Sequence, residues 1–273
     1  MTAQLAFFAD NELLEGPIFD SDNHLLYFVS IFDGLVYCYE PDTKNILSVK
    51  LDSPVSNVFL KSHKKVIAAS KNGFYEIDFA TLKATFVFQI EIENDIRFND
   101  GIEDAQGRYI IGTMGYPEVL ENRGKVFSHF NGTTRVLIEN TTISNGLAFS
   151  NDNTFLYFID TPKRKVAKFD YNLETGEAKF LKYVIEFTGN GSPDGMCKDD
   201  DGNLWIAEWG GSCVSQWNPN TGKKNRSLNL PCPNVTSCIF DNRGGMFVTT
   251  AKSETQDNNL GGGLFYFENN NFQ

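Results

Sequence analysis

Short apolar segments alternate with polar turns along the whole chain, and helical periodicity is nearly absent. Aromatic and β-branched residues dominate segments 25–31, 108–114, 155–161, 203–209 and 246–251, as they do in packed β-strands. Turns rich in Asp, Asn and Gly precede most of these segments, and such residues favour tight reversals of the backbone. The pattern predicts an all-β fold.

The predicted strands recur with a period in the forties. They centre near Leu26, Val66, Tyr109, Leu156, Leu204 and Met246, so successive strands lie 40, 43, 47, 48 and 42 residues apart. A second apolar strand follows each of them, at 34–41, 73–78, 124–130, 164–170, 211–219 and 262–268. A repeat of this length built from short strands is typical of a β-propeller. We therefore predict one domain, residues 1–273, folded as a six-bladed β-propeller.

The two ends of the chain are predicted to close the propeller. An apolar segment, 4–10, precedes the first repeat, and segment 261–268 is the last predicted strand. We expect the N-terminal segment to form the outermost strand of the last blade, because joining the N- and C-terminal strands removes an open sheet edge.

A polar residue in a turn precedes each repeated strand. These residues are Glu15, Asn57, Asn99, Asn145, Asp194 and Thr236. Equivalent positions of all blades face one axis, so we expect the six side chains to converge on one mouth of the central channel. Two carboxylates and three amides that converge from different blades supply the oxygen ligands that a hard divalent cation prefers. The sequence therefore predicts a divalent-cation site at this mouth.

Composition argues against several classes of function. The net charge is −11 and the main basic cluster is the short segment 61–65, which disfavours nucleic acid as a partner. No stretch is long and apolar enough to span a membrane, and the first residues lack the pattern of a secretory signal, so we expect a cytoplasmic protein. The three histidines lie far apart, which argues against a Ser-His-Asp triad. The five cysteines lack paired C-x-x-C spacing and are expected to be reduced.

Four segments carry a resemblance to a known family. Segments 15–20, 97–115, 143–161 and 192–211 resemble the blade motifs of the regucalcin/gluconolactonase family, also called the SMP-30/gluconolactonase/luciferin-regenerating-like family. Its members are six-bladed propellers that hydrolyse sugar lactones with one divalent metal. The matching segments extend over nearly the whole chain in the family's order.

The resemblance assigns roles to individual residues. Glu15, Asn145 and Asp194 match the metal ligands of the family, and Asp194 also matches its proposed general base. Arg97 and Asn99 match residues that contact substrate near the metal. Asp100, the next residue, is interpreted as a structural residue of that turn.

One segment departs from the family pattern. The motif "GTM" continues as "GYPEV" (115–119), so Pro117 occupies the place where vertebrate members are expected to have a substrate-binding Glu. Glu118 beside it is the candidate substrate-binding acid. This departure leaves open a substrate other than an aldonolactone, such as another small lactone or ester.

The function expected from these features is hydrolysis of a small lactone, either a sugar lactone such as gluconolactone or a related compound. One divalent cation, Ca²⁺, Zn²⁺, Mg²⁺ or Mn²⁺, would activate water or polarise the carbonyl. The alternative is a non-catalytic propeller that binds calcium, a small molecule or another protein, because a fold alone does not specify a function. The sequence leaves the oligomeric state open.

Overall fold

The computed structural model describes residues 2–253 and 260–269 and shows an all-β propeller. Four sheets have four antiparallel strands each, in chain order from the inside outward. The first two sheets hold β2 (Leu14–Asp20), β3 (Leu25–Ser30), β4 (Leu35–Glu40) and β5 (Asn45–Lys50), and then β6 (Val55–Ser62), β7 (Lys65–Ser70), β8 (Gly73–Asp78) and β9 (Lys83–Phe88). The next two hold β10 (Ile96–Glu103), β11 (Tyr109–Gly115), β12 (Gly124–Phe130) and β13 (Thr133–Thr141), and then β14 (Ser144–Phe149), β15 (Phe155–Asp160), β16 (Lys165–Asn172) and β17 (Glu177–Glu186).

The remaining strands form one eight-stranded sheet made of two runs. One run holds β18 (Ser192–Lys198), β19 (Leu204–Trp209), β20 (Cys213–Asn218) and β21 (Lys223–Asn229). The other holds β22 (Asn234–Phe240), β23 (Met246–Ala251), β24 (Gly263–Phe267) and the N-terminal β1 (Gln4–Phe8). The two runs meet at a single pair, Trp209 with Asn234. A short 3₁₀ turn, η1 (Thr161–Lys163), follows β15.

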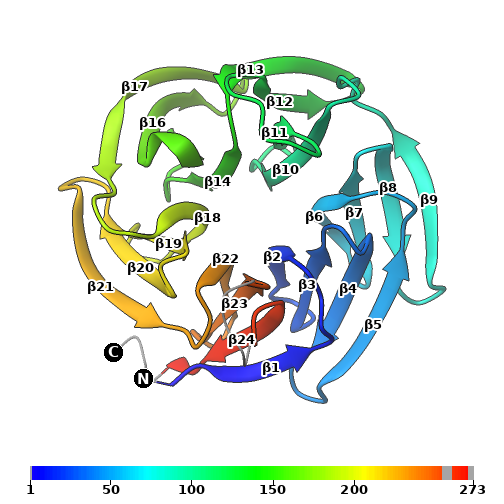
Figure 1. The fold of residues 1–273 in the computed structure, drawn as a ribbon. Helices are drawn as coiled ribbons and strands as arrows, with labels where there is room; N and C mark the ends of the chain where they lie inside the picture. Colours follow the sequence, from blue (N-terminus) through cyan, green and yellow to red (C-terminus); the bar gives the residue numbers. More distant parts are fainter. Residues whose placement is uncertain (1, 254–259, 270–273) are drawn as a thin grey trace.

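The expected pairing of the two chain ends is confirmed. β1 pairs antiparallel with β24, with Gln4 opposite Tyr266 and Phe8 opposite Gly263. In Figure 1 the first strand of each four-stranded sheet (β2, β6, β10 and β14) and of each run (β18 and β22) lies next to the central axis. These six strands are called the first strands below. The strands predicted around the six centres are also confirmed, as β3, β7, β11, β15, β19 and β23.

The core lies between neighbouring sheets. Tyr27 and Val36 of the first sheet are fully buried against Val58 and Val66 of the second, and similar clusters join the other neighbours. Burial of such apolar faces stabilises the radial arrangement by about 25 cal/mol for each Å² of apolar surface removed from water. The five cysteines are buried and free, as expected.

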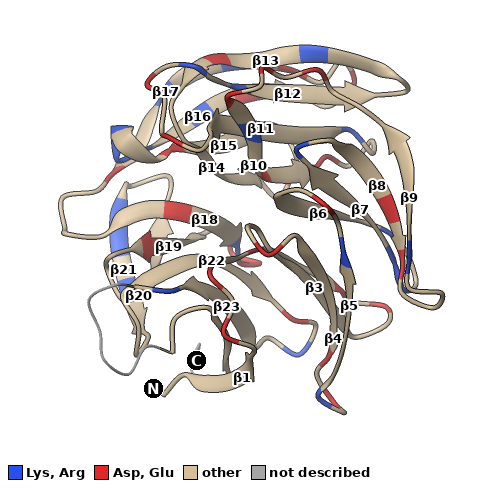
Figure 2. Ribbon diagram, turned by 45° about the vertical axis from the view of Figure 1, so that its right-hand side comes forward, with Lys and Arg blue, Asp and Glu red and all other residues tan. Residues whose placement is uncertain are grey.

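Acidic and basic residues are interspersed along the outer strands and turns in the view of Figure 2. No helix in the described part of the chain is long and apolar enough to cross a membrane.

Candidate metal and substrate site

A β-bulge interrupts every first strand near its beginning. The pairing register shifts after Glu15, Val55, Phe98, Asn145, Pro193 and Val235. A bulge inserts an extra residue into one strand and redirects its side chains. The repeated bulge therefore turns side chains of the first strands toward their neighbours around the axis.

When the six first strands are aligned on their regularly paired parts, two rows of equivalent residues lie next to each other at the bulge. Each row has one residue from every first strand, and the residue of the upper row comes directly before that of the lower row in the chain. The upper row is Glu15, Ser56, Asn99, Asn145, Asp194 and Thr236. The lower row is Gly16, Asn57, Asp100, Gly146, Gly195 and Ser237. Five of the six predicted ring residues lie in the upper row. The assignment of Asn57 was wrong by one residue, because Ser56 occupies the equivalent place.

The non-acidic members of the upper row are linked to the next first strand. Ser56 Oγ donates to the carbonyl oxygen of Phe98, and Asn99 Nδ2 donates to that of Ser144 at 2.9 Å. Thr236 Oγ1 donates to the carbonyl oxygen of Leu14 at 2.6 Å. In each case the acceptor residue immediately precedes the next member of the row.

Asn145 makes the same type of link through an intermediate hydroxyl. Its Nδ2 donates to Thr161 Oγ1 at 2.9 Å, and Thr161 Oγ1 donates to the carbonyl oxygen of Pro193 at 2.9 Å. Glu15 and Asp194, when ionised, cannot donate in this way because a carboxylate only accepts hydrogen bonds. Each accepts from the backbone N–H of the glycine that follows it.

Glycines in the lower row allow neighbouring first strands to approach closely. A Cβ atom at Gly146 would lie 2.7 Å from the carbonyl oxygen of Asp194, and one at Gly195 would lie 2.3 Å from Ser237 Oγ. The backbone and side chain of the next strand occupy that space. This close approach brings the carboxylates of different strands near to one another.

Asp100 stands in the lower row where three other strands have glycine, and it is the site residue that our sequence analysis missed. Its Oδ1 accepts from the backbone N–H of Gly101 at 2.7 Å, and its charge acts on both Glu15 and Asp194. The signal in the sequence was the pair Asp100–Gly101, which repeats the acid-glycine pairs Glu15–Gly16 and Asp194–Gly195.

Two buried carboxylates, Glu15 and Asp194, and the part-buried carboxylate of Asp100 therefore lie near one another between the first strands. Burial, followed by repulsion from Asp100, raises the pKa of Glu15 to about 8. Burial raises the pKa of Asp100 to about 7. Burial and then repulsion from Glu15 and Asp100 raise the pKa of Asp194 well above its ordinary value. An excess of buried negative charge is unfavourable unless a cation offsets it.

Arg97 supplies one positive charge beside these carboxylates. It is 5% exposed, and its Nη1 donates to the carbonyl oxygen of Phe98 and to Asn99 Oδ1, each at 2.8 Å. Burial lowers its pKa to about 10, although the charges of Glu15, Tyr116 and Asp194 oppose this shift. One guanidinium does not balance three carboxylates.

The donor set fits a hard divalent cation. No three His, Cys, Asp or Glu side chains within residues 2–253 and 260–269 converge closely enough to form a metal site by themselves. Glu15 and Asp194 with the amide oxygen of Asn145 form a mixed set of two carboxylates and one amide. Oxygen donors of this kind suit calcium, magnesium or manganese, and a dication would relieve the repulsion among the buried acids.

Glu118 is the remaining residue predicted to bind substrate. It is exposed in the segment that follows β11, and within the described residues its side chain has no hydrogen bond or ion pair to Arg97 or Asn99. Tyr116, two residues earlier, is the member of this segment that lies near Arg97, because its ring stacks on Phe32 and Arg97 Cζ lies 5.7 Å from the centroid of the Phe32 ring.

A cavity of about 570 Å³ lies next to the lower row. It is on the side of the propeller where the first strands end in their turns. Gly16, Asn57 and Asp100 line it at the row, and apolar side chains such as Leu147 and Met196 form its walls. Asp100 therefore lies between this cavity and the upper row.

Comparison with known proteins agrees with this architecture. Residues 13–252 match the family described as the SMP-30/Gluconolactonase/LRE-like region. Regucalcin of Xenopus laevis is 33% identical over 249 residues, which cover 87% of this chain and 82% of that protein.

Two solved structures have the same fold. A calcium-binding protein, regucalcin, of Agrobacterium tumefaciens has a TM-score of 0.90 and 25% identity, with 97% of this chain and 93% of that chain covered. A luciferin-regenerating enzyme has a TM-score of 0.85 and 25% identity, with 94% and 92% covered. The chain therefore belongs to the SMP-30/gluconolactonase/LRE-like family.

Proposed function

We propose that the protein is a lactonase that opens a small lactone at the upper row with the help of one divalent cation. The main observation behind this proposal is that Glu15, Asn145, Asp194 and Arg97 converge near the central axis from the first strands of four different sheets. Membership of a family whose description includes gluconolactonase supports it. We also infer that the eight-stranded sheet comprises two blades, which makes six in all, because only Trp209 and Asn234 pair between its two runs.

The cation would be held by Glu15, Asn145 and Asp194. When bound, a divalent cation supplies Lewis acidity, which stabilises negative charge on the oxygen of a reacting carbonyl. Calcium, magnesium and manganese fit the oxygen donors better than zinc, which favours nitrogen and sulfur ligands.

The residues of the chain would position the lactone and move the proton. Asp194 accepts a proton from the water whose oxygen bonds to the carbonyl carbon. The bond between that carbon and the ring oxygen then breaks, and Asp194 returns the proton to the ring oxygen, so the product is a hydroxy acid. Arg97 and Asn99 orient the carbonyl end of the substrate.

Hydrolysis of a lactone panel, with and without a chelator, tests the proposal. We expect ring opening that the chelator abolishes and that added calcium, magnesium or manganese restores. Cation binding without hydrolysis of any lactone would instead support a non-catalytic calcium-binding propeller. Hydrolysis that resists the chelator would contradict the role of the cation.

A further inference from the structure

An aromatic pair lies at the end of the propeller where the first strands begin. Phe32 follows β3 and Tyr116 follows β11, and both strand ends lie beside the starts of their first strands, since Ser30 pairs with Leu14 and Gly115 with Ile96. The two rings stack with centroids 6.2 Å apart and planes 18° apart. Two segments far apart in the sequence, from different sheets, therefore meet at this mouth.

Arg97 connects the aromatic pair to the carboxylates. Its Cζ lies 5.7 Å from the centroid of the Phe32 ring, and its charge interacts with the carboxylates of Glu15 and Asp194. On the other side, Lys71 Nζ lies 5.0 Å from the centroid of Tyr116. The two cations hold the aromatic rings in place through their π faces. A molecule that reaches the carboxylates past Arg97 passes this pair.

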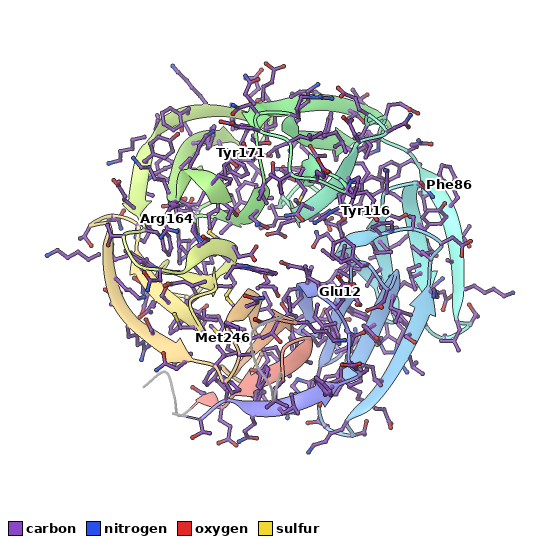
Figure 3. The ribbon with its side chains drawn as sticks, viewed as in Figure 1. Glu12, Phe86, Tyr116, Arg164, Tyr171 and Met246 are labelled. Carbon is purple, nitrogen blue, oxygen red and sulfur yellow. The ribbon has the colours of Figure 1, made fainter. Side chains whose placement is uncertain are left out.

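The pair presents apolar surface to solvent. Phe32 is 41% exposed, although a phenylalanine gains about 1.5–3 kcal/mol when it is fully buried. In Figure 3 the labelled Tyr116 lies closer to the central axis than Phe86, which lies on the outer rim. An exposed aromatic surface beside convergent polar groups is typical of a small-molecule site.

The chemistry of this wall selects the ligand class. The ring of Phe32 offers no hydrogen-bonding group, and Glu118, the nearby acid, is exposed and outside the contacts of Arg97 and Asn99. Against the Phe32 ring a polyhydroxylated substituent would lose hydrogen bonds to water and could replace them only at the hydroxyl of Tyr116 or the ammonium of Lys71, which costs free energy. An alkyl or aryl substituent would gain from contact with the rings.

We propose that Phe32 and Tyr116 form a specificity wall, and that the protein prefers lactones with an apolar alkyl or aryl substituent over polyhydroxylated sugar lactones. This inference rests on the proposed lactonase function for the lactone ring, which is the reacting end of the ligand. The wall contacts the substituent at the other end of the ligand, which does not react. It therefore affects binding whether or not the ring opens.

Binding of inert ring analogues tests the wall separately from catalysis. Lactams resist hydrolysis, so calorimetry can compare lactams of one ring size that carry a phenyl, a hexyl or a polyhydroxyalkyl group. We expect the phenyl and hexyl lactams to bind about tenfold more tightly than the polyhydroxylated one. Phe32→Ala should remove most of this preference, and Phe32→Tyr should retain it.

Phe86→Ala is the matched control. Phe86 is 53% exposed on the outer strand β9, so its removal should leave all three affinities unchanged. Circular dichroism and the melting temperature of Phe32→Ala show whether that variant is folded, and Phe32→Gln, which keeps more of the side-chain volume but is polar, serves in its place if it is not.

Each result decides between distinct conclusions. Equal or tighter binding of the polyhydroxylated lactam, or no binding of any lactam, would overturn the wall. The wall would also be overturned if Phe32→Ala weakened the binding of all three lactams equally. Apolar lactams that bind without hydrolysis of the matching lactones would support the wall and contradict the lactonase function.

Discussion

Asn99 donates a hydrogen bond from Nδ2 to Oδ1 of Asn145 at 2.8 Å. Nδ2 of Asn145 donates to Thr161, so both ends of the Asn145 amide are oriented. Arg97 donates to Asn99 Oδ1, which extends the link from a candidate substrate contact to a candidate metal ligand. The outer partners of a metal ligand orient it and tune its affinity.

This link predicts two effects of Asn99→Ala. Substrate positioning should weaken, and cation affinity should also fall by about two- to tenfold, because the Asn145 amide loses a partner worth roughly 0.5–1.5 kcal/mol. Calorimetry measures the second effect, with Asn45→Ala at an exposed position as the control. Unchanged cation affinity would show that Asn99 does not support Asn145.

Glu15→Gln should weaken the binding of divalent cations by about tenfold or more, because it keeps the shape of the side chain and removes a charged ligand. Calorimetry with calcium, magnesium, manganese and zinc is the measurement, and the exposed Glu174→Gln is the control. If every ion binds Glu15→Gln as well as it binds the wild type, Glu15 is not a ligand.

Asp194→Asn separates metal binding from proton transfer. With the cation at saturation, we expect kcat to fall by about 10²-fold or more, the usual contribution of a general base, while Arg97→Ala should chiefly raise KM. Near wild-type turnover of Asp194→Asn at full occupancy would refute its role as the general base.

Asp100→Asn should raise the melting temperature of the metal-free protein, because it removes a part-buried charge that repels Glu15 and Asp194. The same change should weaken cation binding. The exposed Asp52→Asn should do neither. A lower melting temperature for folded, metal-free Asp100→Asn would indicate a stabilising role for this carboxylate.

Deletion of residues 1–9 removes β1 and exposes the edge of β24. We expect a clearly lower melting temperature and a greater tendency to aggregate, since an unpaired edge strand recruits other chains. Scanning calorimetry and light scattering measure the two effects. Equal stability of the truncated and full chains would show that β1 contributes little to closure.

His129 gives a prediction for pH. It is 7% exposed, its ring stacks on Phe88 with centroids 4.0 Å apart, and burial lowers its pKa. The unfolded chain then binds the proton more readily, so this contribution to stability is present above the ordinary pKa of 6.5 and is lost as the pH falls below it. His129→Phe should reduce the fall in stability between neutral and acidic pH, measured by denaturant unfolding. The exposed His63→Phe should leave it unchanged.

The sequence by itself determined the strands near the axis and most of the upper row. Aromatic and β-branched segments such as β3 and β15 are buried along almost their whole length, so their composition alone marks them as strands. Their spacing then placed Glu15, Asn99, Asn145 and Asp194 at equivalent positions, because period and turn chemistry are local properties.

The outer strands were decided by tertiary structure. β9 and β21 consist mainly of exposed residues. The sequence of β21 has no aromatic or β-branched residue and carries little strand signal, whereas β9 has such residues but most of them are exposed. Each forms because the strand before it offers an unpaired edge, and the value of that pairing depends on the whole sheet.

Tertiary structure also decided the finer arrangement of the site. A bulge shifts the register by one residue, and this places Ser56 rather than Asn57 in the upper row and turns Asp100 toward Glu15 and Asp194. The contact of Phe32 with Tyr116 joins loops of different sheets. Such positions depend on strand pairing and on contacts between residues far apart in the chain, which periodicity does not encode.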